Sequence, residues 1–161
     1  MAVVTSTMRV QQILLGRADA VLRPLGLSFA RYEVLMLLSF SQRRQLPLGK
    51  IGERLQVNPA SVTNAVDRLE EQRLVARTPN PADGRGTLAT LTEKGRATAA
   101  EATAVMNRDV FGELGLAAAD AQLLLDLLGM LRQLAGDTVD GTRHGDGATG
   151  LEVNGDGGPD R

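Results

Sequence analysis

Residues 58–95 read NPASVTNAVDRLEEQRLVARTPNPADGRGTLATLTEKG, a segment in which a helix pattern is followed directly by a hairpin pattern. Asn58 is a good N-cap, and Pro59 suits the first helical position, where its missing N–H is harmless. Val57 and Val62 have the spacing of a hydrophobic staple, which would fix the angle of the preceding turn. The segment therefore predicts a helix that begins at residue 59.

The predicted helix has one apolar face and an opposite face of mostly small and polar side chains. The apolar positions follow the i, i+3, i+4, i+7 spacing and are Val62, Ala65, Val66, Leu69 and the aliphatic stem of Arg73. The candidate DNA-contacting residues are Asn58 at the cap and, on the opposite face and its flanks, Ala60, Ser61, Thr63, Asn64, Asp67 and Arg68. Polar side chains of these types contact base edges and phosphate oxygens in a major groove. An ordinary solvated helix face is the alternative.

The residues before this helix predict a second, shorter helix. Leu48, Ile51 and Leu55 are the apolar positions of residues 48–55, and Gln56-Val57 then makes a tight turn. Two helices in this order, joined by a turn of this length, are typical of a helix-turn-helix.

The residues after the helix predict a hairpin. Residues 74–77 and 87–91 are short runs rich in apolar and β-branched residues, and the loop between them is rich in Pro and Gly. The loop is too polar to pack, so it projects with Asp83, Arg85 and Gly86 at its tip. Asp83 would hold the Arg85 guanidinium in a fixed pose for a narrow minor groove. A surface ion pair of little consequence is the alternative.

The order of these features resembles the MarR family of winged-helix transcriptional regulators. Three segments carry the resemblance: residues 27–35 (LSFARYEVL), residues 69–77 (LEEQRLVAR) and residues 83–95 (DGRGTLATLTEKG). Two positions depart from the family pattern. Ala117 stands where the family often has a Ser or Thr cap, and Pro47-Leu48-Gly49 replaces a more polar helix start. Both departures weaken the start of a helix, and neither changes a DNA-facing position.

The resemblance implies one domain over residues 1–135, mainly α with a small β-wing. A winged helix-turn-helix core of about residues 28–92 would be flanked by dimerisation helices at about residues 7–23 and 93–135. Such a core is too small to cover the apolar stripes of the flanking helices, so we expect a homodimer. Its two recognition helices would contact one face of a pseudo-palindromic duplex. A monomer with one thick helical core is the alternative.

Charge is unevenly distributed along the chain. Residues 1–135 carry 16 Lys and Arg against 13 Asp and Glu, whereas residues 136–161 carry 2 against 6. The second segment also holds 8 of the 18 glycines and little apolar surface, so we expect a disordered Gly/Asp-rich tail. Because the first segment is only mildly basic, DNA affinity must depend on where its cations lie.

Composition and motifs exclude several classes of function. The chain has no cysteine, and its one histidine, His144, lies in the tail, which excludes disulfides, a cysteine-based peroxide sensor and a Cys or His metal cluster. We find no nucleophile triad or phosphate loop, and therefore expect neither an enzyme nor a cofactor. No apolar run reaches the roughly 18 residues that span a bilayer, and no signal-peptide pattern opens the chain. We expect a cytoplasmic protein without a membrane partner.

The resemblance also implies a ligand cleft where the dimerising helices meet the winged helix. The residues expected near it are Leu14, Arg17, Phe29, Tyr32, Met36, Phe40 and Met106. Met and aromatic side chains suit a small aromatic or phenolic effector, and Arg17 would meet a carboxylate; core packing is the alternative for most of them. The expected function is a homodimeric, sequence-specific DNA-binding regulator, a repressor released by such a ligand. The alternative is a winged-helix protein-interaction module without its own operator.

Overall fold

The computed structural model describes residues 1–81, 83, 86–112 and 115–137, and the molecule divides into two units. Residues 1–117 form the first unit. Residue 118 begins the second, whose described part is α6 (Ala118–Leu134) and the three residues after it. The tail that the sequence predicts to be disordered lies outside the described residues, except for its first two positions.

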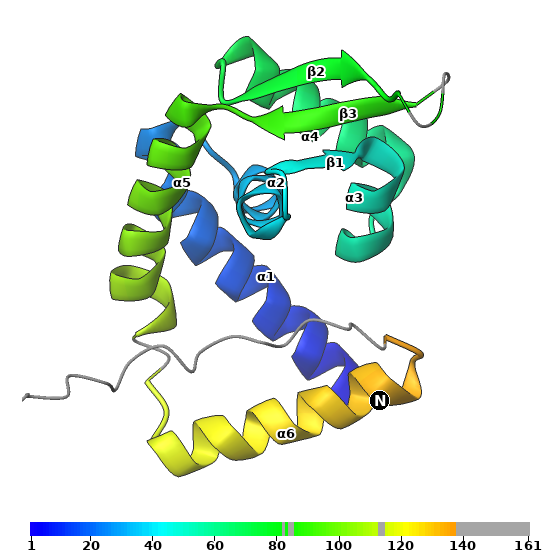
Figure 1. The fold of residues 1–161 in the computed structure, drawn as a ribbon. Coiled ribbons are helices and arrows are strands. Elements are labelled where there is room, and N and C mark those ends of the chain that lie inside the picture. Colours follow the sequence, from blue (N-terminus) through cyan, green and yellow to red (C-terminus); the bar gives the residue numbers. More distant parts are fainter. Residues whose placement is uncertain (82, 84–85, 113–114, 138–161) are drawn as a thin grey trace, which may run out of the picture. The chain divides into compact units, whose positions relative to one another are not determined.

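The first unit is mainly helical with a small sheet, which confirms the predicted fold class (Figure 1). The two helices of the predicted helix-turn-helix begin at the predicted residues 48 and 59. In chain order the elements are α1 (Ala2–Leu22), η1 (Arg23–Leu25), α2 (Phe29–Phe40), β1 (Gln45–Pro47), α3 (Leu48–Leu55), α4 (Pro59–Glu71), β2 (Val75–Pro79), β3 (Thr87–Leu91), α5 (Glu93–Met106) and the π-helical turn η2 (Asn107–Phe111).

The sheet is antiparallel with the order β1-β3-β2. β2 and β3 form the predicted hairpin, in which Val75 pairs with Leu91. β1, which pairs Leu46 with Ala89, was not predicted. Three residues are too few to show the alternation of a strand, and Pro47 within them argues against one.

α2 lies at the centre of the first unit. It packs against α1, α4, α5 and β3 (Figure 1), and its Leu35 and Leu38 have no exposed surface. Burying one such side chain stabilises the fold by roughly 1.5–3 kcal/mol. Asp19 on α1 accepts the N–H of Phe29 at the start of α2, with 2.7 Å between Oδ1 and N. A tertiary hydrogen bond therefore joins the first two helices.

α4 turns its apolar face into this core, where Val62, Val66 and Leu69 are buried. The prediction that the stem of Arg73 extends this face is wrong. α4 ends before Arg73, which is exposed and has a left-handed backbone with φ of 61°. The chain reverses direction there to enter β2, so this side chain leaves the helical spacing.

The start of α5 is joined to the segment that follows α4. Thr92 caps α5 by accepting the Gly95 N–H at 2.9 Å, and its hydroxyl lies 3.0 Å from the Leu74 carbonyl oxygen. Lys94 Nζ donates to the Gln72 carbonyl at 2.9 Å. A Cβ at Gly95 would lie 2.0 Å from the Leu74 oxygen, so only glycine fits at this close approach. Contacts with the start of α5 thus fix the end of α4.

α6, taken by itself, has no buried residue. Its large apolar side chains are exposed: Leu123, Leu124, Leu125, Leu127, Leu128, Met130, Leu131 and Leu134. The first half of α1 is similar, with exposed Val3, Val4, Met8, Val10 and Ile13. Within the described ranges, no helix is both long enough and apolar enough to cross a membrane.

Candidate nucleic-acid interface

The turn between α3 and α4 is tight, as predicted. Gln56 ends α3 in a left-handed conformation with φ of 53°, and the Val57 N–H donates to the Gly52 carbonyl at 3.1 Å. A Cβ at Gly52 would lie 3.2 Å from the Val57 oxygen and 3.3 Å from a methyl carbon of Val62. The absence of a side chain at residue 52 therefore lets α3 and α4 approach closely.

The start of α4 confirms the predicted cap. Asn58 has an extended backbone, and its Oδ1 accepts the Ser61 N–H at 2.8 Å, while Pro59 occupies the first helical position. This bond satisfies one of the free N–H groups at the helix start. The Asn58 oxygen is engaged in capping, whereas its amide nitrogen has no partner among the described residues.

The first half of α4 presents an exposed polar face. The residues predicted to contact DNA there are all exposed: Ala60, Ser61, Thr63 and Asn64. The side chains of Ser61, Thr63 and Asn64 have no hydrogen-bond partner among the residues that the structure describes. These groups are therefore available to bases or phosphates, held on a helix whose start is fixed.

The second half of α4 differs, because its charged side chains have protein partners. Asp67 Oδ1 lies 2.5 Å from Arg77 Nη1 on β2, and Arg68 Nη1 lies 3.0 Å from Glu71 Oε2. Asp67 is among the residues predicted to contact DNA, and in the structure it is partly buried and paired with Arg77 of the wing. Arg77 was not among the residues predicted for this site. The signal that would have found it is a pair of carboxylates on one helix face, followed by an arginine on the next strand.

The wing continues beyond the ends of β2 and β3. The Asn80 N–H donates to the Gly86 carbonyl at 2.9 Å, and the Gly86 N–H donates to the Asp83 carbonyl at 2.8 Å. Asp83 is exposed. Arg85, the predicted minor-groove residue, lies outside the described residues, and so does its predicted pairing with Asp83. In the described part of the wing, the hairpin pairing therefore extends as far as Asn80 and Gly86.

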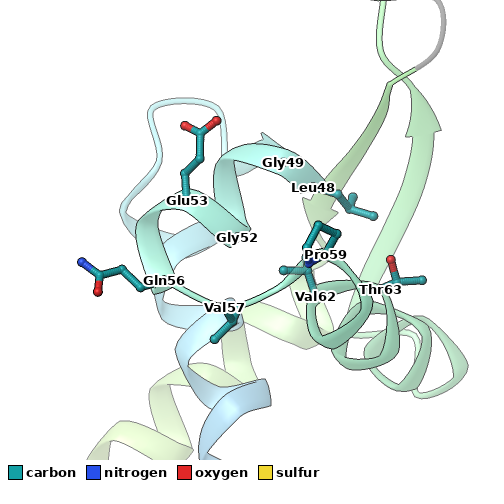
Figure 2. A pocket seen from close by; sticks show the side chains of 9 residues that line it. All are labelled: Leu48, Gly49, Gly52, Glu53, Gln56, Val57, Pro59, Val62 and Thr63. Atoms are coloured by element: carbon teal, nitrogen blue, oxygen red, sulfur yellow. The ribbon is translucent and has the colours of Figure 1, made fainter.

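A hollow of about 530 Å³ lies between α3 and the first turns of α4 (Figure 2). It is lined by Leu48, Gly49, Gly52, Glu53, Gln56, Val57, Pro59, Val62 and Thr63. In Figure 2 the side chains of Glu53 and Gln56 point away from it, so apolar side chains and glycine backbone dominate its surface. A second hollow of about 500 Å³ lies between the start of α3 and the wing. Both hollows belong to the helix-turn-helix and wing.

Two of the predicted ligand residues on α2, Tyr32 and Met36, contact Thr103 of α5. Tyr32 is buried, and its hydroxyl lies 3.1 Å from Thr103 Oγ1, which is also 3.2 Å from the sulfur of Met36. The rings of Phe29 and Tyr32 are 6.1 Å apart between centroids. Met106 has no exposed surface, so it is part of the core in this structure.

The remaining predicted ligand residues are more accessible. Leu14, Phe29 and Met36 are partly exposed, and Arg17 and Phe40 are exposed. Glu33 lies on the same helix α2, and burial raises the pKa of its carboxyl above the ordinary range for glutamate. In the part of the chain that the structure describes, no group of three or more His, Cys, Asp or Glu side chains could hold a metal ion.

A helix-turn-helix followed by a two-stranded wing, with long helices on either side in sequence, defines a winged-helix DNA-binding protein. The sequence model of the MarR family matches residues 25–86. The chain is 34% identical over 119 residues to the HTH-type transcriptional repressor Rv2887 of Mycobacterium tuberculosis, covering 74% of this chain and 77% of that one. The chain belongs to the MarR family of transcriptional regulators, which is not a family of enzymes.

Two solved structures agree with this assignment. The crystal structure of Sco5413, a MarR family transcriptional regulator from Streptomyces coelicolor, has a TM-score of 0.80 and 52% identity, and covers 86% of this chain and 96% of that chain. A mutant of MarR from E. coli, solved in complex with operator DNA, has a TM-score of 0.74 and 26% identity, and the match covers 81% of this chain and 94% of that chain.

Proposed function

We propose that this protein is a homodimeric repressor that binds a pseudo-palindromic operator through α4 and the wing. The observation that carries the proposal is the exposed polar face at Ser61, Thr63 and Asn64. Their side chains have no hydrogen-bond partner among the described residues, and the two ends of the helix that presents them are fixed. Small polar side chains on such a helix suit the edges of bases in a major groove. The similar E. coli MarR was solved with operator DNA, and Rv2887 carries the name of a repressor.

The exposed apolar helices support a dimer. α6 and the first half of α1 leave thirteen large apolar side chains exposed. Apolar surface left in water costs about 25 cal/mol per Å², and a helix face that exposes many large apolar side chains is typical of an interaction site. A second copy of the chain is the partner that would also place two recognition helices on one duplex.

The alternative is a winged-helix module that binds another protein and has no operator. An interface of that kind would need an apolar exposed patch on α4. The exposed positions of α4 are instead mostly polar or small, and its large apolar residues Val62, Val66 and Leu69 are buried. The composition of this surface therefore favours DNA.

The effector proposed for this regulator is a small aromatic or phenolic compound that lowers DNA affinity. The side chains that support it are Phe29 and Met36 on α2, both partly exposed, and Arg17 on α1, which is exposed and would meet a carboxylate. A ligand that prefers one arrangement of the recognition helices shifts the population away from the arrangement that the operator needs. Linkage then requires that DNA lower ligand affinity by the same factor.

Operator selection tests the proposal directly. Duplexes would be selected from a random-sequence pool by the full-length protein, and the affinity of the selected duplex would be measured by fluorescence anisotropy against a shuffled duplex over a range of salt. We expect the selected sequence to be an inverted repeat, bound at least about 10³-fold more tightly than the shuffled control. Equal affinity for both duplexes would contradict the proposal. If the selected duplex binds as expected, salicylate added to the complex tests the effector in the same assay.

A further inference from the structure

We infer that Arg77, on the first strand of the wing, is a positioning residue that fixes the wing to the recognition helix. The inference rests on the proposed function, because the position of the wing matters only if α4 and the wing contact the same duplex. Arg77, Asp67, Glu70 and the Thr63 carbonyl are called the Arg77 clamp below.

The clamp joins one strand to one face of α4. Arg77 Nη1 lies 2.5 Å from Asp67 Oδ1 and 3.6 Å from Glu70 Oε2, and Nη2 donates to the Thr63 carbonyl at 3.2 Å. The backbone N–H of Arg77 donates to Glu70 Oε1 at 3.2 Å. Residues 63, 67 and 70 have the i, i+4, i+7 spacing of a single helical stripe. One arginine therefore contacts two turns of the recognition helix.

The Arg77 side chain is more buried than the other cation that pairs with a carboxylate of α4, Arg68. The Arg77 side chain is 25% exposed, whereas Arg68 in its pair with Glu71 is 59% exposed. The Nε–H of Arg77 is buried and has no acceptor in the described part of the chain. A planar guanidinium can engage a carboxylate and a carbonyl together, while a lysine ammonium is a single point charge. The site is therefore specific for arginine.

The clamp gives Asp67 a role different from a base contact. Its Oδ1 lies 2.5 Å from Arg77 Nη1, so the pairing with Arg77 accounts for this carboxylate without a base contact. The clamp instead sets the orientation of β2, and with it the hairpin, relative to the exposed face at Ser61 and Asn64. Contacts of α4 in the major groove and of the wing in the minor groove then occur together, because one rigid unit carries both.

Methylation protection separates a positioning role from a structural one. Dimethyl sulfate modifies guanine N7 in the major groove and adenine N3 in the minor groove, so one reagent reports both contacts. The test uses full-length Arg77→Met at saturating concentration on a duplex selected by the wild-type protein. Arg43→Met is the matched control, since it removes the same charge from an exposed position outside α4 and the wing.

We expect Arg77→Met to keep guanine N7 protection at the recognition helix and to lose adenine N3 protection at the wing. Its affinity should fall by roughly two- to 150-fold, the range of coupling within one hydrogen-bonded network. Arg77→Lys should keep part of the N3 protection, and it decides the question if Arg77→Met does not fold. Arg43→Met should keep both protections. Unchanged N3 protection in Arg77→Met, parallel loss of both protections, or the same loss in Arg43→Met would overturn the inference.

A double-mutant cycle tests the role of Asp67. If Asp67 acts only through its contact with Arg77, Asp67→Asn should reduce adenine N3 protection in the wild-type background. In the Arg77→Met background the same substitution should cause no further change in protection. A change of base preference caused by Asp67→Asn in the Arg77→Met background would show that Asp67 contacts a base, and would overturn the inference. Failure of the proposed function is distinct from all of these results, because the wild-type protein would then select no duplex.

Discussion

Both halves of α4 carry polar side chains, neutral in the first half and charged in the second, and the two sets differ in whether they contact the rest of the protein. In the first half, Ser61, Thr63 and Asn64 have no side-chain partner among the described residues. In the second half, Asp67 is bound to Arg77 and Arg68 to Glu71. The comparison teaches that composition alone does not define a DNA-contacting face. In the described part of the chain, the polar side chains left without a protein partner are those of the first half, Ser61, Thr63 and Asn64.

The two ends of the helix are also fixed by different kinds of contact. The first end is fixed locally, by the Asn58 cap and by Pro59. The second end is fixed by residues distant in sequence, because Thr92 and Lys94 bond to the segment that follows α4. Because both sets of contacts are at the ends of α4, the exposed side chains of its first half stay accessible to a ligand as large as a duplex.

The largest expected effect comes from breaking the contact that fixes the second end. Gly95→Ala would place a Cβ 2.0 Å from the Leu74 carbonyl oxygen, which is backbone and cannot rotate away. Alanine favours a helix over glycine by about 1 kcal/mol. Overpacking against backbone should outweigh this gain and destabilise the protein by about 3 kcal/mol, measured by urea unfolding at one protein concentration.

Gly16→Ala is the matched control, since a Cβ at Gly16 in α1 would meet nothing within 4 Å. It should leave stability unchanged or raise it by up to about 1 kcal/mol. A Gly95→Ala protein as stable as Gly16→Ala would show that α5 does not hold the end of α4, and the contrast between the two ends would fail.

The next largest effect concerns base recognition by the first half of α4. Asn64→Ala should lower the preference for one base pair of the operator by about 1–3 kcal/mol, the worth of a good bidentate contact, with no change in stability. Competition over all single-base operator variants measures this preference. Asn107→Ala, the same change at an exposed position after α5, is the control. An equal loss on every variant would reassign Asn64 to phosphate contact.

The same contrast explains how much of the site the sequence could predict. The cap at Asn58, the turn at Gln56 and the starts of α3 and α4 depend on neighbouring residues, and all were predicted. The partner of Asp67 lies ten positions along the chain on a different element, so spacing within the helix gave no sign of it. The burial of Met106 depends on how α5 packs in the folded unit, and a single helix pattern does not contain that information.

Removing the Asn58 cap tests whether local contacts fix the start of α4. Asn58→Ala leaves the Ser61 N–H without its acceptor and should destabilise the protein by about 1 kcal/mol. Asn58→Ser keeps a capping oxygen and should be close to wild type in stability. Comparing their operator affinities separates two roles. If Asn58→Ser loses affinity as Asn58→Ala does, the amide of Asn58 contacts DNA; if it retains affinity, the residue acts as a cap.

The smallest effect concerns Arg68, the charged residue of α4 whose pairing is most exposed. Glu71→Gln removes its partner, and because both side chains are more than half exposed the stability should change by less than about 0.5 kcal/mol. DNA affinity should rise, because the duplex meets one negative charge fewer and Arg68 is released. If Arg68 then binds a phosphate, the slope of log K against log salt should steepen by about one unit.

Glu101→Gln on α5 makes the same change of charge at an exposed position away from α4, and it separates the two causes. A similar rise in affinity in both variants would reflect net charge alone. A steeper slope of log K against log salt in Glu71→Gln, but not in Glu101→Gln, would show that Arg68 binds a DNA phosphate once the Glu71 carboxylate is removed. Equal slopes in wild type and Glu71→Gln would instead mean that the second half of α4 makes no phosphate contact through Arg68, and that DNA contact by this helix is restricted to its first half.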